Sequence, residues 1–307
     1  MQPHEANRYN VVAPPDLFDG ATALLGPGRD QFLQNYKFDI TPATDDQPHF
    51  FHFFKWRALP ELLSLKEQGG LPLLEWGYPV LVATLAQAAL ASLLLIAAPA
   101  AWVSWSGARH KNNALPRTGP RGRVLVYFLA IGFAFMFIEI AFIQKFVLFL
   151  SHPLYAVAVV LFAFLLFAGI GSAASRRLHD AALRKWRNPV AAVALAVVLP
   201  IGLSALFCLT LLAWLFQHSM GLPDALRIVI SAALIAPLAF FMGMPFPLGL
   251  ARVAAIDARL VPWAWAINGC ASVTGAVLAT LLAIHVGFTA VVVVALMLYG
   301  VAAAARP

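Results

Sequence analysis

The chain has 307 residues, of which 61% are hydrophobic and 11% are charged. Soluble domains carry about 25% charged residues, so this composition excludes an ordinary soluble enzyme and indicates a membrane protein. Residues 1–75 carry ten acidic and six basic side chains, whereas residues 76–307 carry four and 15. The excess positive charge therefore lies in the apolar part, where we interpret it as setting membrane orientation and not as binding nucleic acid.

Residues 1–75 form a polar segment that we expect to be mostly helical or irregular. The pattern Pro-Pro-Asp at 14–16 predicts a helix over Asp16–Leu25, and a second short helix is predicted over Arg29–Tyr36. Leucines at helical spacing among charged residues predict an amphipathic helix over Leu59–Gln68, lying on the membrane surface. The start of the chain lacks the basic and apolar regions of a signal peptide.

Seven apolar runs follow, and most have the length of about 20 residues that a bilayer-spanning helix needs. Lipid offers the backbone no hydrogen-bond partners, so each run should be a helix. The predicted fold is an all-α polytopic membrane protein, with about seven transmembrane helices over residues 76–307. A tight hairpin is expected at 285–287, between the last two runs. The runs are Trp76–Val103, Val124–Leu150, Leu154–Ala174, Pro189–Phe216, Ala225–Met242, Trp263–Ile284 and Gly287–Ala305.

Basic residues occur in every second loop. Five lie in 105–123, five in 176–187 and two in 251–260, whereas 151–153 and 217–224 contain no Lys or Arg. The positive-inside rule then places the basic loops and the C-terminus in the cytoplasm, and seven crossings place residues 1–75 outside. Cys208 and Cys270 lie in separate runs, so no disulfide framework is predicted.

One carboxylate, Glu139, lies near the middle of the second run, where a bare charge costs at least about 2.5–3.5 kcal/mol. Two interpretations stay open: a contact for a proton, ion or substrate, or a neutral, hydrogen-bonded acid that locks two helices together. Gln87 and Asn268 are the candidate partners. Lys145 lies about 240° round the same helix and is close enough to its end to reach the interface.

Two further stretches concern helix packing. Ala271, Gly275 and Ala279 recur every four residues and predict a close approach of two helices. The sequence GMPFPLG at 243–249 contains Pro245 and Pro247, which cannot continue a regular helix. We interpret the stretch from Gly243 as a turn at the membrane surface, the alternative being a broken helix that lines a cavity, as in transporters.

Motifs that carry chemistry are missing from the sequence. His49 and His52 are a single pair at ligand spacing, which is a weak sign of a metal site, and Asp45-Asp46 is typical of a turn. There is no glycine-rich phosphate loop, nucleophile elbow, HExxH or CxxCH. We therefore predict no catalytic residue, no metal site and no cofactor in this chain.

Four stretches resemble the C-terminal membrane portion of bacterial membrane-bound spermidine-synthase-like proteins, which are also described as S-adenosylmethionine-dependent methyltransferase-like. They are 39–63 (DITPATDDQPHFFHFFKWRALPELL), 135–172, 242–250 (MGMPFPLGL) and 265–280 (WAINGCASVTGAVLAT). In that family a nucleotide-binding catalytic domain precedes the part that matches residues 7–56. The resemblance implies that residues 1–75 are the tail of a missing soluble domain and its join to the membrane. The chain would then be a fragment, a truncated gene product, or a subunit whose soluble half is encoded separately. A nucleotide of the S-adenosylmethionine type would bind only where that domain is present.

The resemblance conflicts with the orientation, because a domain that uses S-adenosylmethionine should face the cytoplasm. The leading hypothesis is the membrane domain of such a protein in the bacterial inner membrane, without catalysis of its own. Its partners would be the lipid bilayer and a separately encoded soluble transferase-like domain. Two alternatives stay open: a small-molecule or ion transporter with a midplane site at Glu139, and a scaffold subunit that uses the Phe-rich faces of the second and third runs.

Overall fold

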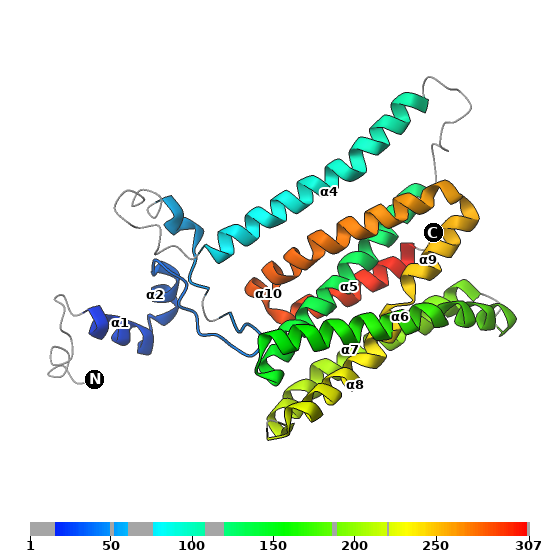
Figure 1. Ribbon diagram of the computed structural model, residues 1–307. Coiled ribbons are helices and arrows are strands. Elements are labelled where there is room, and N and C mark those ends of the chain that lie inside the picture. Colours follow the sequence, from blue (N-terminus) through cyan, green and yellow to red (C-terminus); the bar gives the residue numbers. More distant parts are fainter. Residues whose placement is uncertain are drawn as a thin grey trace. The chain divides into compact units, whose positions relative to one another are not determined.

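A computed structural model describes residues 16–49, 52–60, 76–107, 120–185, 189–219 and 221–305 (Figure 1). The chain divides into two compact units, residues 1–80 and 81–307. Regular structure in the described residues is helical, apart from one isolated bridge between Thr44 and Gln47. Most of the amphipathic helix expected at 59–68 lies outside the described residues.

The first unit contains both predicted short helices, α1 (Asp16–Leu25) and α2 (Arg29–Asn35), and a 3-10 turn, η2 (Trp56–Ala58). Two basic side chains next to η2 bind the C-terminal end of α2. Lys55 Nζ donates to the carbonyl oxygens of Leu33 (2.8 Å) and Tyr36 (3.2 Å), and Arg57 donates to Tyr36 (2.8 Å). Cations at a helix C-terminus satisfy its last carbonyls, so these contacts hold the segment after residue 50 onto α2.

Residues 81–307 form a bundle of long apolar helices, and six segments are long and apolar enough to cross a membrane. The prediction of an all-α polytopic membrane protein is confirmed. Large hydrophobic side chains on the outside of the bundle, such as Leu203 and Phe207, have lipid as their natural solvent. The helices are α4 (Gly77–Gly107), α5 (Pro120–Leu150), α6 (Pro153–Lys185), α7 (Pro189–Ser219), α8 (Asp224–Met242), α9 (Pro245–Ile256) and α10 (Val261–Ala305).

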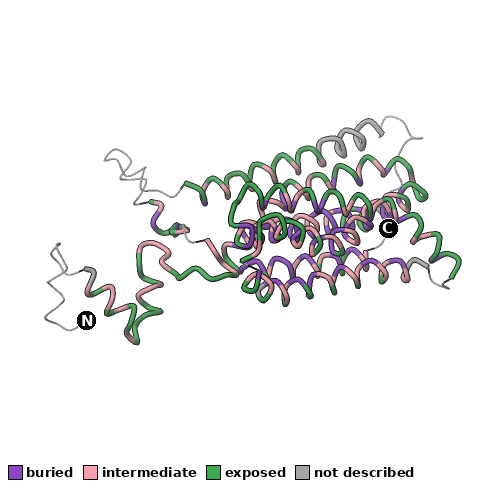
Figure 2. The backbone as a smooth tube through the Cα atoms, turned by 60° about the horizontal axis from the view of Figure 1, so that its bottom comes forward, coloured by how far each residue is buried: buried purple, intermediate pink, exposed green. Residues whose placement is uncertain are grey.

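Helix α5 is the centre of the bundle. In its most apolar window 61% of the residues are buried, against 0–39% in the other five candidate spans (Figure 2). Phenylalanines fill the space around it, and the Phe149 and Phe216 rings stack with centroids 4.5 Å apart. At the other extreme, no residue of α4 between Leu81 and Ile96 is buried. The bundle is therefore built on α5, with α4 loosely attached.

The long helix α10 is two antiparallel helices joined at Gly287. Positions along α5 show the reversal: Gly132 lies against Ala271 and Met136 against Gly275, so the first half runs parallel to α5. Arg123, near the start of α5, donates to the carbonyl of Ala305, so the second half runs antiparallel. Gly287 has φ 86° and ψ 163°, a conformation that residues with a side chain rarely adopt. The predicted hairpin is confirmed, and the sixth candidate span contains two of the predicted runs.

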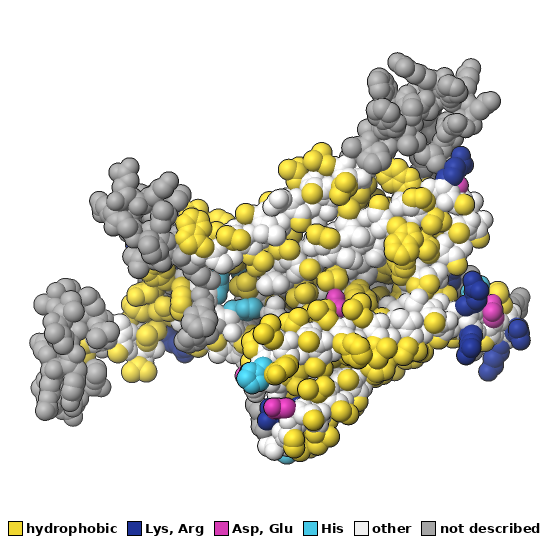
Figure 3. All heavy atoms as spheres, viewed as in Figure 1, with side chains coloured by type: hydrophobic (Ala, Val, Ile, Leu, Met, Phe, Trp, Pro, Cys, Tyr) yellow, Lys and Arg dark blue, Asp and Glu magenta, His cyan; other side chains and the backbone are white. Residues whose placement is uncertain are grey.

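The basic segment expected as a loop at 176–187 is largely a continuation of α6, which extends to Lys185. Residues with good helix propensity, such as Arg and Ala, continue a helix once it leaves the lipid. Lys and Arg side chains gather at this end of α6 (Figure 3). We use "basic end" for the end of the bundle where α5 begins, α6 ends and α10 ends, and "Arg227 end" for the opposite one.

Helices α6 and α8 are in contact through their backbones. A methyl group added to Gly171 would collide with the carbonyl oxygen of Phe240, and one added to Gly243 would collide with that of Ala168. Gly171 of α6 packs against Phe240 of α8, and Gly243, directly after α8, packs against Ala168 of α6. Neither helix can therefore move away from the other without losing both contacts. Close backbone approach at small residues is a main source of helix association in lipid.

Candidate functional site

Glu139, the intramembrane carboxylate singled out in the sequence, is buried in the bundle, with 5% of its surface exposed. It lies on the face of α5 that carries Gly132 and Met136, which pack against α10. Within the part of the chain that the structure describes, its carboxylate has no hydrogen bond or ion pair. The interpretation of Glu139 as a hydrogen-bonded lock between two helices therefore lacks its hydrogen bond.

The two proposed partners of Glu139 lie elsewhere. Gln87 is exposed on α4. Asn268 packs beside Gly132, which is seven residues, or about 10 Å, before Glu139 along α5. Lys145, six residues beyond Glu139, is partly buried near the Arg227 end. Helix-to-helix register cannot be derived from hydropathy, and these residues do not form the expected polar cluster around Glu139.

The stripe of small residues on α10 lies in a helix interface. Ala271, Gly275 and Ala279 are buried. Gly275 packs against Phe133 and Met136 of α5, and Ala271 against Gly132. Small residues on both helices bring the backbones together, which is the packing role that their spacing predicts.

The stretch from Gly243 to Gly249 begins with the predicted turn, which is packed against other helices of the bundle and is not exposed. Helix α8 ends at Met242 and α9 begins at Pro245, with Pro247 in its first turn, where a missing N–H costs little. Met242, Met244 and Pro245 are all buried. The prolines start a new helix and the glycines admit neighbouring groups: Ala168 at Gly243, and the Tyr127 ring at Gly249.

A cavity lies beside this broken helix, at the basic end. Its volume is about 40 Å³, and it is lined by Tyr127 of α5, Pro245 and Arg252 of α9 and Tyr299 of α10. The Tyr127 hydroxyl donates to the carbonyl oxygen of Pro245 at 2.6 Å. Tyr299 is 1% exposed, and its hydroxyl has no hydrogen-bond partner in the described part of the chain. A buried hydroxyl without a hydrogen bond lowers the stability of the folded protein by about 1–3 kcal/mol. The Tyr299 hydroxyl therefore destabilises the bundle unless another molecule accepts its hydrogen bond.

The other walls of the cavity are aliphatic. Val193 and Val197 of α7 and Ala302 of α10 face it, all buried. One side of the cavity therefore offers hydroxyl and guanidinium donors and the other offers methyl groups. Such a combination is typical of a small-molecule site, although the volume is far below the ~300 Å³ of ordinary ligand pockets. It suits two or three water molecules or a few ligand atoms, since each water needs about 10–15 Å³ of such volume.

Sequence reasoning missed the residues of this cavity. Arg252 was treated as an orientation charge, and Tyr127 and Tyr299 lie in apolar runs like other aromatic residues. A hydroxyl-bearing ring in a run that otherwise uses Phe was the available signal, because a tyrosine inside a bundle needs a partner for its O–H.

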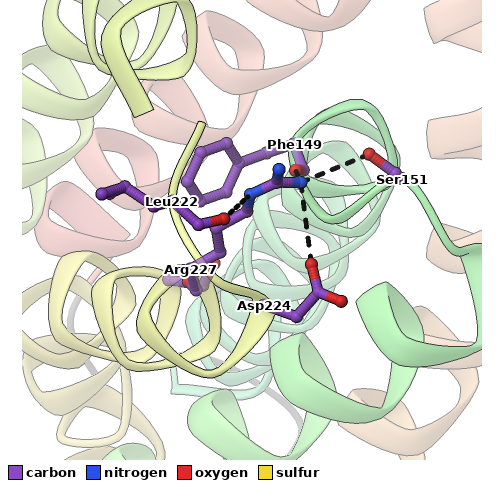
Figure 4. A network of polar contacts seen from close by, with 6 residues as sticks. Phe149, Ser151, Leu222, Asp224 and Arg227 are labelled. Atoms are coloured by element: carbon purple, nitrogen blue, oxygen red, sulfur yellow. Dashed lines mark hydrogen bonds and ion pairs between the residues drawn. The ribbon is translucent and has the colours of Figure 1, made fainter. Parts of the chain in front are cut away.

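Arg227, also missed, organises the Arg227 end (Figure 4). Its guanidinium donates to the carbonyl oxygens of Leu222 (3.1 Å) and Phe149 (3.3 Å), and lies 3.9 Å from the Asp224 carboxylate. Phe149 is in the last turn of α5, and Ser151 closes that helix with a positive φ of 61°. A partly buried cation at a helix C-terminus satisfies the last carbonyl groups and interacts favourably with the helix dipole. This is a structural clamp between α5 and the start of α8.

Polar residues of the first unit form local contacts. Asp39 accepts two hydrogen bonds from Thr41, through its N–H (3.0 Å) and its hydroxyl (2.6 Å). Burial acts to raise the pKa of Asp39, but these bonds and the nearby Lys55 outweigh it and hold the pKa below its usual range. Burial also lowers the pKa of His49, helped by the nearby His52. Among the described residues, no group of three or more His, Cys, Asp or Glu side chains could hold a metal ion.

Comparison with known proteins adds no relative. No protein-family model, no curated protein and no solved structure matches this chain. The function is therefore argued from the residues themselves.

Proposed function

We propose that this chain is the membrane domain of a spermidine-synthase-like, S-adenosylmethionine-dependent transferase-like protein, and that it anchors a catalytic domain without binding the nucleotide itself. The observation that carries this proposal is the place of the four resembling stretches. They hold Lys55 and Arg57, which fix the first unit, and the glycines at 171 and 243, which join α6 to α8. They also hold the packing stripe of α10. The shared residues thus build and attach a bundle.

The cavity at the basic end is not itself a candidate nucleotide site, because its volume of about 40 Å³ is far below the roughly 300 Å³ of ordinary ligand pockets. In this proposal the bundle lies in the bacterial inner membrane. A soluble domain outside these 307 residues would supply both the nucleotide site and the chemistry.

Calorimetry on the purified 307-residue chain tests the proposal. We expect no binding of S-adenosylmethionine at micromolar concentration by the chain alone. We also expect tagged chain, isolated from membranes, to retain a soluble protein that does bind S-adenosylmethionine. Micromolar binding by the chain alone would overturn the anchoring role, as would a partner set without any nucleotide-binding protein.

A second candidate function, transport of a proton, an ion or a small cation, is favoured by Glu139. A buried carboxylate on the central helix, without a bond to the described residues, is available to a cargo. This candidate predicts that Glu139→Gln abolishes uptake into vesicles while the protein keeps its fold. Unfolding of the variant would instead give Glu139 a structural role, and unchanged uptake would exclude it as a cargo site.

A third candidate is a scaffold subunit that uses the Phe-rich faces of the second and third runs. Phe128, Phe142, Phe146 and Phe149 of the second run and Phe164 of the third are buried in the bundle, so these rings are not available to a partner. Phe162 of the third run is 66% exposed and stays available to one.

A further inference from the structure

The cavity at the basic end presents hydrogen-bond donors and lacks an acceptor for one of them. The Tyr127 hydroxyl donates its only proton to the carbonyl oxygen of Pro245. The Tyr299 hydroxyl still has a proton to donate, and no described residue accepts it. Arg252, which also lines the cavity, brings a guanidinium group whose N–H groups are all donors. A ligand for these groups must be rich in oxygen and negatively charged, as a phosphate is.

The rest of the cavity suits hydrocarbon. Val193 and Val197 of α7 face the cavity, while Leu195 and Leu199 of the same helix are exposed on the side of α7 that faces lipid. An amphiphile could thus place its polar group at the tyrosine hydroxyls and its chain along α7. The cavity volume of about 40 Å³ admits a few oxygen atoms of a head group and no more.

The depth of the cavity agrees with a head group. It lies at the basic end, where Arg123 donates to the last carbonyl of α10 and where α9 begins. Phosphates of membrane lipids lie at the level of helix ends, and basic pockets between transmembrane helices bind anionic head groups. A water-soluble phosphate ion has no hydrocarbon that could pack against the aliphatic wall of the cavity.

We propose that this cavity binds the phosphate group of an anionic glycerophospholipid, with the Tyr299 hydroxyl and the Arg252 guanidinium as its donors. The lipid phosphate accepts the hydrogen bond of the Tyr299 hydroxyl, for which no described side chain is an acceptor, and the acyl chain of the lipid covers α7. This inference concerns the bundle alone, and it holds whether or not the chain serves a transferase domain.

The experiment uses the full chain purified in detergent, with native mass spectrometry and thermal unfolding as the two measurements. Phosphatidylglycerol, phosphatidylcholine and inorganic phosphate are added separately. We expect phosphatidylglycerol to be retained and to raise the unfolding temperature. Phosphatidylcholine should bind less well, because its choline cation approaches Arg252, and inorganic phosphate should have no effect. Tyr299→Phe should weaken phosphatidylglycerol binding about tenfold, the loss expected for one hydrogen bond to a charged group.

Two matched controls and a second variant keep the test decisive. Arg252→Gln should weaken phosphatidylglycerol binding in the same way as Tyr299→Phe. Tyr155→Phe and Arg259→Gln should leave it unchanged, because both side chains are exposed outside the cavity. Equal retention of phosphatidylglycerol by the wild type and by both cavity variants would overturn the proposal. So would equal binding of phosphatidylcholine, or equal protection by inorganic phosphate, which would point to a site for free phosphate.

Discussion

At the Arg227 end of the bundle, one guanidinium satisfies carbonyl groups from two parts of the chain, whereas at the basic end the buried Tyr299 hydroxyl has no partner among the described residues. Both ends bury polar groups next to helix termini. The polar groups at the Arg227 end form hydrogen bonds with each other, whereas the Tyr299 hydroxyl at the basic end, beside a cavity and a broken helix, has no partner among the described residues. Groups that satisfy each other are typical of a structural joint, while an unsatisfied group beside a cavity marks a place for something else.

The largest expected effect tests whether the close packing of α6 against α8 holds the basic end and the Arg227 end in place relative to each other. In Gly171→Ala the new methyl group meets the backbone of Phe240, which cannot turn aside as a side chain can. We expect the free energy of unfolding to fall by about 3 kcal/mol, at the upper part of the range for overpacking. Denaturant unfolding in micelles measures it. Gly169→Ala, on the same helix with open space around it, should show no loss.

The next largest effect should come from opening the Arg227 end. Arg227→Gln removes the charged donors from the carbonyls of Phe149 and Leu222, and should cost about 2 kcal/mol. Arg259→Gln is the control, since that guanidinium is exposed and paired with Asp257 two residues away. Equal unfolding temperatures for the two variants would show that Arg227 is not a clamp.

A smaller effect separates the two tyrosines of the basic end. Tyr127→Phe loses a hydrogen bond of 2.6 Å and leaves the Pro245 carbonyl with one bond fewer, at a cost of about 1 kcal/mol. In lipid-free detergent, Tyr299→Phe should cost nothing or stabilise, because it removes an unpaired hydroxyl. Thermal unfolding of both variants compares them. A loss for Tyr299→Phe without lipid as large as that for Tyr127→Phe would mean that its hydroxyl is already satisfied.

The smallest effect lies outside the bundle, in the turn after α2. The pKa of Asp39 is below its unfolded value, so its contribution to stability is complete above a pH of about 4. That contribution is lost as the pH falls through the folded-state pKa and Asp39 takes up a proton. Tryptophan fluorescence, with Trp56 as a reporter, should show less acid sensitivity in Asp39→Asn than in the wild type.

Most of the fold could be predicted from the sequence, and most of the candidate site could not. Apolar runs located every long helix, because exclusion of the backbone from water is a local requirement that each run meets alone. At 243–249, proline and glycine correctly indicated an end of α8, but they did not indicate that the interruption would be buried. The prediction also stopped α6 too early, since hydropathy detects lipid contact and not helix propensity.

The sequence by itself determined that this protein has the helices of a membrane protein, where most of its long helices begin and end to within a few residues, and that Ala271, Gly275 and Ala279 pack closely. Only the tertiary structure decided which polar groups meet. Tyr127 and Pro245 are 118 residues apart, and Arg227 and Phe149 are 78 apart. The physical reason is that hydropathy acts over one helix at a time, while a hydrogen bond between helices depends on their register and rotation, which the packing of the whole bundle sets.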